Sequence, residues 1–548
     1  MLPFLDKFFR QLAAVPICLM VILQVATLRQ ESQTFDEGVH LAAGYRYWNT
    51  GDFSLNVEHP PLQKLLSAAP LFLLRPPLPT DEKLLIDQSE YARAFLFGGA
   101  ADGDRLLFYG RMPTVLLSVL LLVAVAWATR LYFGAPAALG ALWLCALDPN
   151  LIAHGRYVTT DLVSALLFFL TVVLWVDYWR APTGQRAVWA TVAGGLALGA
   201  KFSMLLLLPL IPALLLLHAV LLRPGWRRLG RSLAVLAVSA VVAIVMVAGL
   251  YAPETWRVSQ GRTINVAAET LLSFTFPPST YLTGLRTLMD HNREGHTAFL
   301  LGQVSDQGWW YYFPVVFAVK SPLVVLLLTV MLVGIGLWKL PSIVRTPAAG
   351  FVWAALAAAP LAYFAVTLNS RINLGVRHLL PVYPFLYVLG MAALAALLPL
   401  RRYLIVAGAV IGLQTVESAV VYPDYLGFFN AAVGGSSAGP RYLLDSNIDW
   451  GQDLKKLKTY METHPGPVCL EYFGSVEPKH YGIQFEYLPK TWDKDERERL
   501  DCVGAISHTL LRDLYVRPGS YEWLRRRPQI GRVGSSLALY DLRKPKGR

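Results

Sequence analysis

Long apolar runs separated by short charged breaks are the main pattern along this chain. Three runs contain no charged side chain at all, at residues 232–253, 347–370 and 379–400. A helix rises about 1.5 Å per residue, so each run is long enough to cross a hydrocarbon core of about 30 Å. The pattern predicts a polytopic α-helical membrane protein.

Apolar runs and charged breaks together predict about 11 transmembrane helices. The first covers residues 11–28, and we interpret it as an uncleaved span because the run is long and no clear A-x-A cleavage site follows. The alternative is a cleaved signal peptide. Residues 61–74 are apolar but short, which favours a re-entrant or interfacial helix. The other ten predicted spans are 107–129, 134–150, 162–179, 187–200, 203–222, 232–252, 321–338, 350–368, 379–399 and 403–421.

The composition agrees with a membrane protein, and the distribution of charged residues predicts its orientation in the membrane. The chain has 55% hydrophobic and 16% charged residues, with 49 basic against 37 acidic side chains. With 11 spans, the segments on the N-terminal side contain 13 of the basic residues and two acids, leaving 36 and 35 elsewhere. Basic residues accumulate on the cytoplasmic side of membrane proteins. We therefore expect a cytoplasmic N-terminus and an extracytoplasmic C-terminus, and no nucleic-acid partner.

This topology divides the chain into two predicted domains. Residues 1–421 form a transmembrane module whose outer face carries two large loops, 29–106 and 253–320. Residues 422–548 form a small C-terminal α/β domain on the same outer face. Within it, residues 450–463 have helical spacing, and two shorter stretches, 468–473 and 502–506, have strand-like composition.

Cys469 and Cys502 fall within the two strand-like stretches of the C-terminal domain. An exported domain permits a disulfide between them, and the alternative is two buried free thiols. Asp445, Asp449 and Asp453 recur every four residues in the same domain, where packing and capping is the favoured interpretation.

Three carboxylates of the outer loops are candidate catalytic groups. Asp36 and Glu37 are adjacent, just past the first span, where a general base or a metal ligand could lie. Asp161 opens the fourth span, so a helix N-cap is an equally good explanation for it. A solvated loop start is the structural alternative for the Asp36-Glu37 pair.

Cations also gather on the predicted outer face, where each could bind an anion or serve as a structural anchor. His59 precedes a double proline that fixes the backbone at the membrane face. An Arg can bind a phosphate with two hydrogen bonds, whereas a lone Lys at this depth either meets an anion or reaches toward solvent. The candidate phosphate-binding residues are His59, Arg156, Lys201, Lys320, Arg377 and His378.

The order of these motifs resembles a known enzyme class. It runs from Asp36-Glu37 through His59-Pro60-Pro61-Leu62 and a loop from Asp148-Pro149-Asn150 to Thr159-Thr160-Asp161, and ends with Arg377-His378 before Leu379-Leu380-Pro381. This is similar to the GT-C glycosyltransferases, especially the protein O-mannosyltransferase and aminoarabinose transferase branch. The stretches 295–302, 308–314 and 444–454 resemble a bacterial subgroup, and the similarity covers about residues 30–540.

The resemblance implies a sugar donor carried on a polyprenyl phosphate and transfer at the outer face of a bacterial inner membrane. It matches Asp36 to the catalytic acid of the family and Asp161 to its second acidic position. Some relatives have a Lys before the double proline, where this chain has His59, and a neutral His binds phosphate more weakly. The large domain that some relatives insert in the later outer loop is absent here.

We therefore expect an inverting glycosyltransferase that moves the sugar to an acceptor hydroxyl, with Asp36 as general base. A protein, a lipid and a cell-surface glycan are alternative acceptors, and a divalent cation held by Asp161 is a candidate cofactor. The main alternative function is a flippase or transporter for a lipid-linked sugar. A transporter should place charged residues within the spans along a transport path. The predicted spans of this chain have almost no charged residues, and Glu417 is the main exception. A non-catalytic membrane scaffold is the second alternative.

Overall fold

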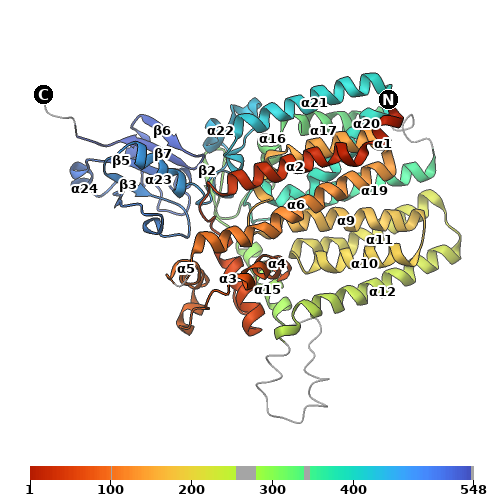
Figure 1. Cartoon of the computed structure of the whole chain (residues 1–548), viewed down its shortest axis with the longest axis horizontal. Helices are drawn as coiled ribbons and strands as arrows, with labels where there is room; N and C mark the ends of the chain where they lie inside the picture. The colour runs from red at the N-terminus through yellow and green to blue at the C-terminus, as the bar shows by residue number, and fades with distance from the viewer. Residues whose placement is uncertain (100, 255–278, 339–345, 545–548) are drawn as a thin grey trace, which may run out of the picture.

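The computed structural model describes residues 1–99, 101–254, 279–338 and 346–544. It consists of a bundle of long helices and a smaller domain built on a β-sheet (Figure 1). The N-terminus lies at one end of the bundle and the sheet domain at the opposite end (Figure 1). The first large loop, with α3 (Glu37–Thr50) and α5 (Gln88–Phe97), lies at the same end as the sheet domain.

Eight helical segments of the described residues are long and apolar enough to cross a membrane. Two of them combine a short 3-10 turn with a longer helix: η3 (Phe202–Leu206) continues into α11 (Leu207–Leu222), and η4 (Val376–Val382) continues into α20 (Tyr383–Leu397). The remaining six are α2 (Phe9–Leu28), which follows the short α1 (Leu2–Lys7), α6 (Gly103–Phe133), α9 (Thr160–Arg180), α12 (Trp226–Leu250), α19 (Pro347–Thr367) and α21 (Leu400–Val421).

The other three predicted spans are also helical, but they differ from a simple crossing. The span expected at 321–338 is preceded by α16 (Tyr312–Lys320), which meets α17 (Leu323–Trp338) at an angle of 118°, so the pair gives a ninth candidate span. α7 (Ala135–Ala146) and α10 (Gly184–Leu198) are only 12 and 15 residues long. Helix length and composition therefore support eight or nine spans among the described residues, and the count of eleven stays a prediction.

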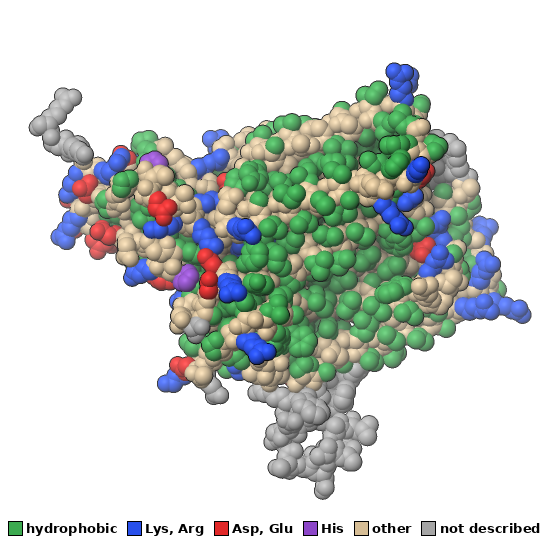
Figure 2. Space-filling model, in the orientation of Figure 1, with side chains coloured by type: hydrophobic (Ala, Val, Ile, Leu, Met, Phe, Trp, Pro, Cys, Tyr) green, Lys and Arg blue, Asp and Glu red, His purple; other side chains and the backbone are tan. Residues whose placement is uncertain are grey.

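Hydrophobic side chains cover the visible face of the bundle, and charged side chains gather at its two ends (Figure 2). A soluble protein does not leave so large a continuous apolar surface exposed to water. Together with the long apolar helices, this surface identifies a multi-pass membrane protein.

The first large loop folds into short helices against the end of the bundle. α3 (Glu37–Thr50) ends at Gly51, whose φ of 64° is the left-handed conformation that glycine tolerates best. The expected short apolar helix is present as α4 (Leu62–Ala68) and η1 (Ala69–Leu73). η2 (Glu82–Ile86) and α5 (Gln88–Phe97) complete the loop, and the Asp87 carboxylate caps α5 by accepting from the amides of Ser89 and Glu90.

The described part of the second loop begins with α15 (Ser279–Glu294), and the preceding stretch of the predicted loop 253–320 lies outside the described residues from 255. A two-stranded antiparallel ribbon of β1 (Ala298–Leu300) and β2 (Gln303–Ser305) follows. A further short helix, α8 (Pro149–His154), lies between α7 and α9.

A chain of short helices leads from the bundle to the sheet domain. Its apolar side chains, including Phe428, Ile448 and Trp450, pack in the same core as the membrane helices. The elements are η5 (Tyr425–Gly427), η6 (Ala431–Val433), α22 (Gly435–Ala438), η7 (Gly439–Arg441) and η8 (Asp445–Asn447).

The sheet domain has two small cores of its own, which include Leu454 and Leu457 of α23. Its five strands lie in the order β4-β3-β5-β7-β6, with β3 parallel to β4 and β5, and β7 antiparallel to β5 and β6. The small α/β domain is therefore confirmed. Its elements are α23 (Leu454–Thr463), β3 (Val468–Glu471), η9 (Pro478–Tyr481), β4 (Glu486–Tyr487), α24 (Lys494–Arg499), β5 (Val503–Ser507), α25 (His508–Leu511), α26 (Glu522–Arg525), β6 (Gln529–Val533) and β7 (Leu537–Asp541).

Cys469 and Cys502, whose pairing the sequence left open, form a disulfide beside the strands β3 and β5. The aspartates of the 444–454 stretch have the predicted packing and capping roles. Asp449 is buried and accepts the amide of Thr509, while Asp453 is buried and accepts the amides of Ser535 and Ser536.

Candidate active site

A cavity of about 570 Å³ lies at the end of the bundle that carries α3 and the sheet domain. The start of α3, the turn before α4, the start of α9, the turn before η3, α15 and η4 all contribute to its walls. Its polar lining consists of Asp36, His40, Asn56, Glu58, His59, Gln88, Ser89, Thr159, Thr160, Asp161, Lys201, Ser203, His291, Asn292, Arg293, Ser370, Arg377 and His378.

Asp36 stands at the N-cap position of α3, but its carboxylate makes no capping hydrogen bond, so it is available to the cavity. The preceding backbone is tied to the 444–454 stretch. The amide of Phe35 donates to the carbonyl of Trp450 at 2.9 Å, and the amide of Ser32 donates to the carbonyl of Gln452 at 2.9 Å. The specific sequence motif at 444–454 therefore holds the loop that presents Asp36.

Two carboxylates and two cations alternate along one wall of the cavity. Arg377 Nη1 lies 2.8 Å from Asp36 Oδ2 and 3.9 Å from Asp161 Oδ2. Lys201 Nζ lies 2.6 Å from Asp161 Oδ1. The guanidinium of Arg377 also lies 4.5 Å above the ring of Trp450, which fixes its plane by a cation–π contact.

Three buried polar atoms of this wall have no hydrogen-bond partner among the described residues: Arg377 Nε, Asp161 Oδ2 and Thr159 Oγ1. Buried polar atoms are satisfied in most folded proteins, and each exception calls for an explanation. One donor and one hydroxyl without partners beside Lys201 give the wall the capacity to bind an anionic, hydrogen-bonding ligand.

Two histidines on the opposite side of Asp161 are neutral. The rings of His40 and His59 lie 5.3 Å apart at nearly a right angle. His40 Nδ1 donates to the carbonyl of Val158 at 2.8 Å, so its Nε2 carries the lone pair. Burial lowers the pKa of His40 and holds the pKa of His59 well below its ordinary value. His59 therefore lines the cavity as a neutral, polar side chain at neutral pH and not as a cation.

Comparison with known proteins gives this geometry a context. Residues 103–251, which contain α6 to α12, match the family described as dolichyl-phosphate-mannose-protein mannosyltransferase. None of the curated protein sequences matches the chain. The solved structure of ArnT from Cupriavidus metallidurans bound to undecaprenyl phosphate superimposes with a TM-score of 0.50 at 15% identity, covering 97% of this chain and 99% of that chain. This chain therefore shares the fold of ArnT, and part of its helix bundle is similar to that mannosyltransferase family.

A second solved structure, the archaeal oligosaccharyltransferase AglB from Archaeoglobus fulgidus in complex with an inhibitory peptide and a dolichol-phosphate, has a TM-score of 0.47 and 10% identity. The match covers 76% of this chain and 56% of that chain.

The structure brings six of the nine predicted site residues to the cavity. They are Asp36, His59, Asp161, Lys201, Arg377 and His378. The other three, Glu37, Arg156 and Lys320, do not line the cavity, and each has a structural partner.

Glu37 is fully buried and its carboxylate is completely engaged. Arg111 donates to both of its oxygens, at 2.8 and 2.6 Å. The amides of Thr34 and Val158 donate to the same carboxylate at 2.9 and 3.0 Å. A carboxylate with four donors and no solvent access supports the fold, so we correct the predicted catalytic role of Glu37 to a structural one.

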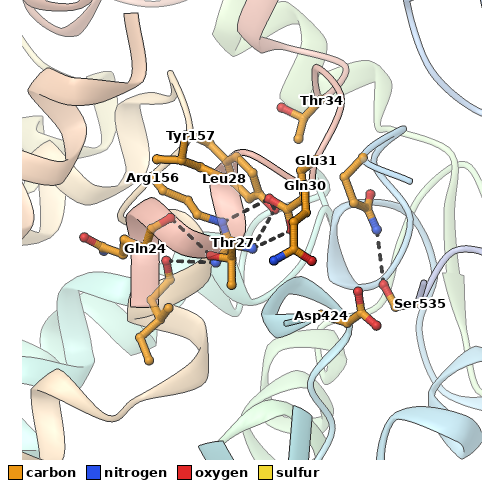
Figure 3. A network of polar contacts seen from close by, with 12 residues as sticks. Gln24, Thr27, Leu28, Gln30, Glu31, Thr34, Arg156, Tyr157, Asp424 and Ser535 are labelled. Carbon is orange, nitrogen blue, oxygen red and sulfur yellow. Dashed lines mark hydrogen bonds and ion pairs between the residues drawn. The ribbon is translucent and has the colours of Figure 1, made fainter. Parts of the chain in front are cut away.

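Arg156 is also buried, and it pairs with Glu31 rather than facing the cavity. Its Nε and Nη2 donate to the two oxygens of Glu31 at 3.0 and 2.6 Å, and the hydroxyl of Tyr157 donates to Glu31 at 3.0 Å. Figure 3 shows Arg156 and Tyr157 directed toward Glu31, near Leu28 at the end of α2. The predicted phosphate-binding role of Arg156 is therefore replaced by a role in anchoring the first loop.

Lys320, at the end of α16, is turned toward backbone carbonyls. Its Nζ donates to the carbonyls of Leu426 at 2.9 Å and Asn447 at 2.6 Å, and it lies 4.7 Å above the ring of Phe429. The side chain is fully buried. It joins the helix bundle to the segment that leads to the sheet domain, so the predicted phosphate contact is corrected.

Sequence reasoning missed several cavity residues. His40 lies one helical turn after Asp36, so helical spacing alone could have placed it on the same face. Glu58 is adjacent to His59 in a motif that was already singled out. Asn56 and Gln88 gave no signal, because isolated amides in a loop are common and the fold brings them together from separate segments.

The candidate divalent cation can be tested against the residues present. Among the described residues, no group of three or more His, Cys, Asp or Glu side chains could hold a metal ion. Asp36 forms an ion pair with Arg377, and Asp161 forms an ion pair with Lys201, so both carboxylates are already neutralised. A divalent ion would have to compete with both cations, so this donor set does not fit a metal.

Proposed function

We propose that this protein is an inverting glycosyltransferase that moves a sugar from a polyprenyl phosphate to an acceptor hydroxyl at the outer face of a bacterial inner membrane. The observation that carries the proposal is the alternation of Asp36, Arg377, Asp161 and Lys201 along one cavity wall. A reaction that deprotonates a hydroxyl and releases a phosphate requires a base and cations in this proximity.

The cations supply the phosphate site. Arg377 and Lys201 both line the cavity, and among the described residues Lys201 donates one hydrogen bond, to Asp161. Their charges favour a lipid-linked phosphate at the membrane-facing end of the cavity, between α9 and η4. The structure of ArnT contains undecaprenyl phosphate, and the shared fold supports a polyprenyl phosphate as the donor lipid here.

Asp36 is the proposed general base. The oxygen of the acceptor hydroxyl attacks the anomeric carbon of the donor while Asp36 takes the hydroxyl proton. The bond between the anomeric carbon and the phosphate oxygen breaks, and its electron pair leaves with the polyprenyl phosphate. Arg377 and Lys201 stabilise the negative charge that develops on that oxygen. Attack and departure occur on opposite faces of the carbon, which inverts its configuration.

Asp161 positions the cations. It contacts Lys201 at 2.6 Å and lies 3.9 Å from Arg377, and it is nearly inaccessible to solvent. A buried carboxylate that contacts both cations fixes their positions before the phosphate arrives. Asp36, with a quarter of its side chain exposed, is the carboxylate that an acceptor can reach.

Orientation follows from the charge distribution. The bulk of the basic excess lies at the N-terminal end of the bundle, which supports a cytoplasmic N-terminus. The cavity and the disulfide-containing sheet domain lie at the other end, and a disulfide is typical of an oxidising compartment. A periplasmic reporter fused after Arg548 should be active, and a cytosolic signal there would contradict the orientation.

Asp36→Asn tests the proposal. The substitution keeps the shape of the side chain but removes the base, and general base catalysis contributes about 10²–10⁴-fold. We expect release of polyprenyl phosphate from a labelled lipid-linked sugar to fall by at least that range while the donor still binds. Glu90→Gln is the matched control, because Glu90 lies in the same loop, exposed and outside the cavity.

Near wild-type turnover of Asp36→Asn at saturating donor would remove Asp36 from the mechanism. Loss of donor binding together with activity would instead show that Asp36 maintains the site through Arg377. Movement of the intact donor between leaflets, without release of polyprenyl phosphate, would support the flippase alternative.

A further inference from the structure

A second polar group lines the cavity and takes no part in the reaction described above. It is formed by Asn56 and Glu58, in the turn before α4, and by Gln88, the first residue of α5. Asn56 has a φ of 57°, a left-handed conformation that Asn adopts more readily than most residues other than glycine.

The three side chains are connected by hydrogen bonds. Asn56 Nδ2 donates to Glu58 Oε2 at 3.1 Å and to Gln88 Oε1 at 3.2 Å. Gln88 Nε2 donates to Glu58 Oε1 at 3.3 Å. Both hydrogens of the Asn56 amide are therefore used. One hydrogen of Gln88 Nε2 and one further acceptor position on each oxygen of Glu58 stay available to the cavity.

Lys64 holds this group from behind. Its Nζ is fully buried and donates to Asn56 Oδ1 at 3.2 Å, to the Asn56 carbonyl at 2.6 Å and to the hydroxyl of Tyr47 at 2.9 Å. A cation on the carbonyl end of an amide polarises it, which strengthens the hydrogen bonds donated from the other end. The orientation of Asn56, and with it that of Glu58, is therefore fixed before a ligand arrives.

Glu58 differs from the other two cavity carboxylates. Asp36 and Asp161 each form an ion pair, whereas Glu58 has no cationic side chain within 4 Å in the described part of the chain. Among the described residues its carboxylate accepts from the two amides, and the residue lines the cavity, so it has further acceptor capacity for a ligand. A carboxylate of this kind repels a phosphate and accepts hydrogen bonds from hydroxyl groups.

We propose that Asn56, Glu58 and Gln88 form the subsite for the sugar ring of the donor. Two neighbouring hydroxyls of the ring donate to the two oxygens of Glu58, and one of them accepts from Gln88 Nε2. The assignment rests on the proposed function, because it places the phosphate of the same donor at Arg377 and Lys201. One anionic and one cationic wall then orient the donor, with its anomeric carbon between them and within reach of Asp36.

The neighbouring fold supports a fixed position for this subsite. A Cβ atom at Gly284 of α15 would lie 2.0 Å from the carbonyl of Val57, the residue between Asn56 and Glu58. α15 therefore packs directly on the turn, and only glycine allows that approach. Leu285, Leu288 and Met289 of the same helix line the cavity and can cover the apolar face of a sugar ring.

The experiment measures the affinity of the purified, full-length protein for three lipids: polyprenyl phosphate, the same lipid carrying a hexopyranose, and mono-deoxy versions of that donor. In Glu58→Gln, we expect affinity for the sugar-linked lipid to fall about ten- to a hundred-fold, as for loss of a charge-assisted contact. Affinity for polyprenyl phosphate alone should stay within about two-fold. Glu90→Gln, on the same helix as Gln88, should change neither.

The deoxy donors locate the contact. A donor that lacks one of the two hydroxyls facing Glu58 should show a smaller difference between wild type and Glu58→Gln than the intact sugar, and the other deoxy donors should retain the full difference. The subsite assignment is overturned if Glu58→Gln weakens both classes of lipid equally, if it weakens neither, or if every deoxy donor shows the same difference as the intact sugar. Failure of the proposed function looks different: polyprenyl phosphate would then bind wild type and Arg377→Ala equally.

Discussion

Two groups of ion pairs begin at neighbouring residues of the first loop, and they differ in how completely their hydrogen-bonding capacity is used. In the framework group, Glu37 pairs with Arg111 and Glu31 pairs with Arg156. All four side chains are at most 2% exposed. Each carboxylate receives several donors, and neither pair lines the cavity.

In the cavity group, Asp36 pairs with Arg377 and Asp161 pairs with Lys201. Three of these side chains are between 11% and 26% exposed, and Arg377 Nε and Asp161 Oδ2 have no partner. The comparison shows that a charged residue in an outer loop can be assigned to the fold or to the candidate site only when its remaining hydrogen-bonding capacity is known. Saturated pairs hold the fold, and unsaturated pairs are available to substrate.

The largest expected effect comes from breaking the framework group. Arg111→Met leaves the Glu37 carboxylate buried without its cation, and breaking a buried pair in this way costs about 3–5 kcal/mol. We expect most of the protein to be lost from the detergent-soluble, monodisperse fraction. The double variant Arg111→Met with Glu37→Gln should recover part of the loss. Normal yield and thermal stability of Arg111→Met would contradict the framework role.

Breaking the cavity group should instead spare the fold. Arg377→Ala removes a charge-assisted contact worth about 1.5–3 kcal/mol, which corresponds to a roughly ten- to hundred-fold loss of donor affinity. The unfolding temperature should change little, because Arg377 already has an unpartnered donor atom. Equal donor affinity in wild type and Arg377→Ala, measured with a fluorescent polyprenyl phosphate, would return Arg377 to a structural role.

A chelator experiment tests whether the cavity group needs a divalent cation for sugar transfer. Because Arg377 and Lys201 neutralise the two carboxylates, we expect a chelator to change the rate of sugar transfer by less than about two-fold. A chelator effect that added Mg²⁺ or Mn²⁺ reverses would show that a divalent cation displaces these side chains during the reaction.

The smallest expected effect concerns His59. Burial holds its pKa well below the ordinary value, so the ring is already neutral at about pH 8 and stays neutral at about pH 6. His59→Asn should therefore leave the pH profile of donor affinity unchanged over this range, although the affinity itself can shift. A rise of wild-type affinity toward acid that the variant lacks would show that His59 binds the phosphate as a cation.

Much of this arrangement was predictable from the sequence. The long apolar runs identify the membrane helices because few other structures bury such runs. The outer-loop motifs singled out Asp36, Asp161 and Arg377, which the structure brings to one cavity. The short helices α7 and α10 show the limit of the count, because composition does not reveal where a helix ends inside the bundle.

The errors within the site have a common physical cause. Glu37 and Asp36 are neighbours of similar chemistry, but the helical turn points them in different directions, and Glu37 meets Arg111 from a helix 74 residues away. Likewise, nothing in the local sequence shows that Glu31 neutralises Arg156. The tertiary structure decides which charged side chains have all their hydrogen-bonding partners. The sequence alone shows where the charged residues are but not which residues they contact.

The central claim is that the cavity group transfers a sugar with inversion. The most direct measurement supplies the purified protein with a polyprenyl-phosphate sugar labelled with ¹³C at the anomeric carbon, and with membranes of a strain that lacks this protein as the source of acceptor. Our account predicts that polyprenyl phosphate is released and that the one-bond carbon–hydrogen coupling of the product corresponds to the anomer opposite to that of the donor. A product with the donor's own configuration, or intact donor recovered on the other leaflet, would contradict it.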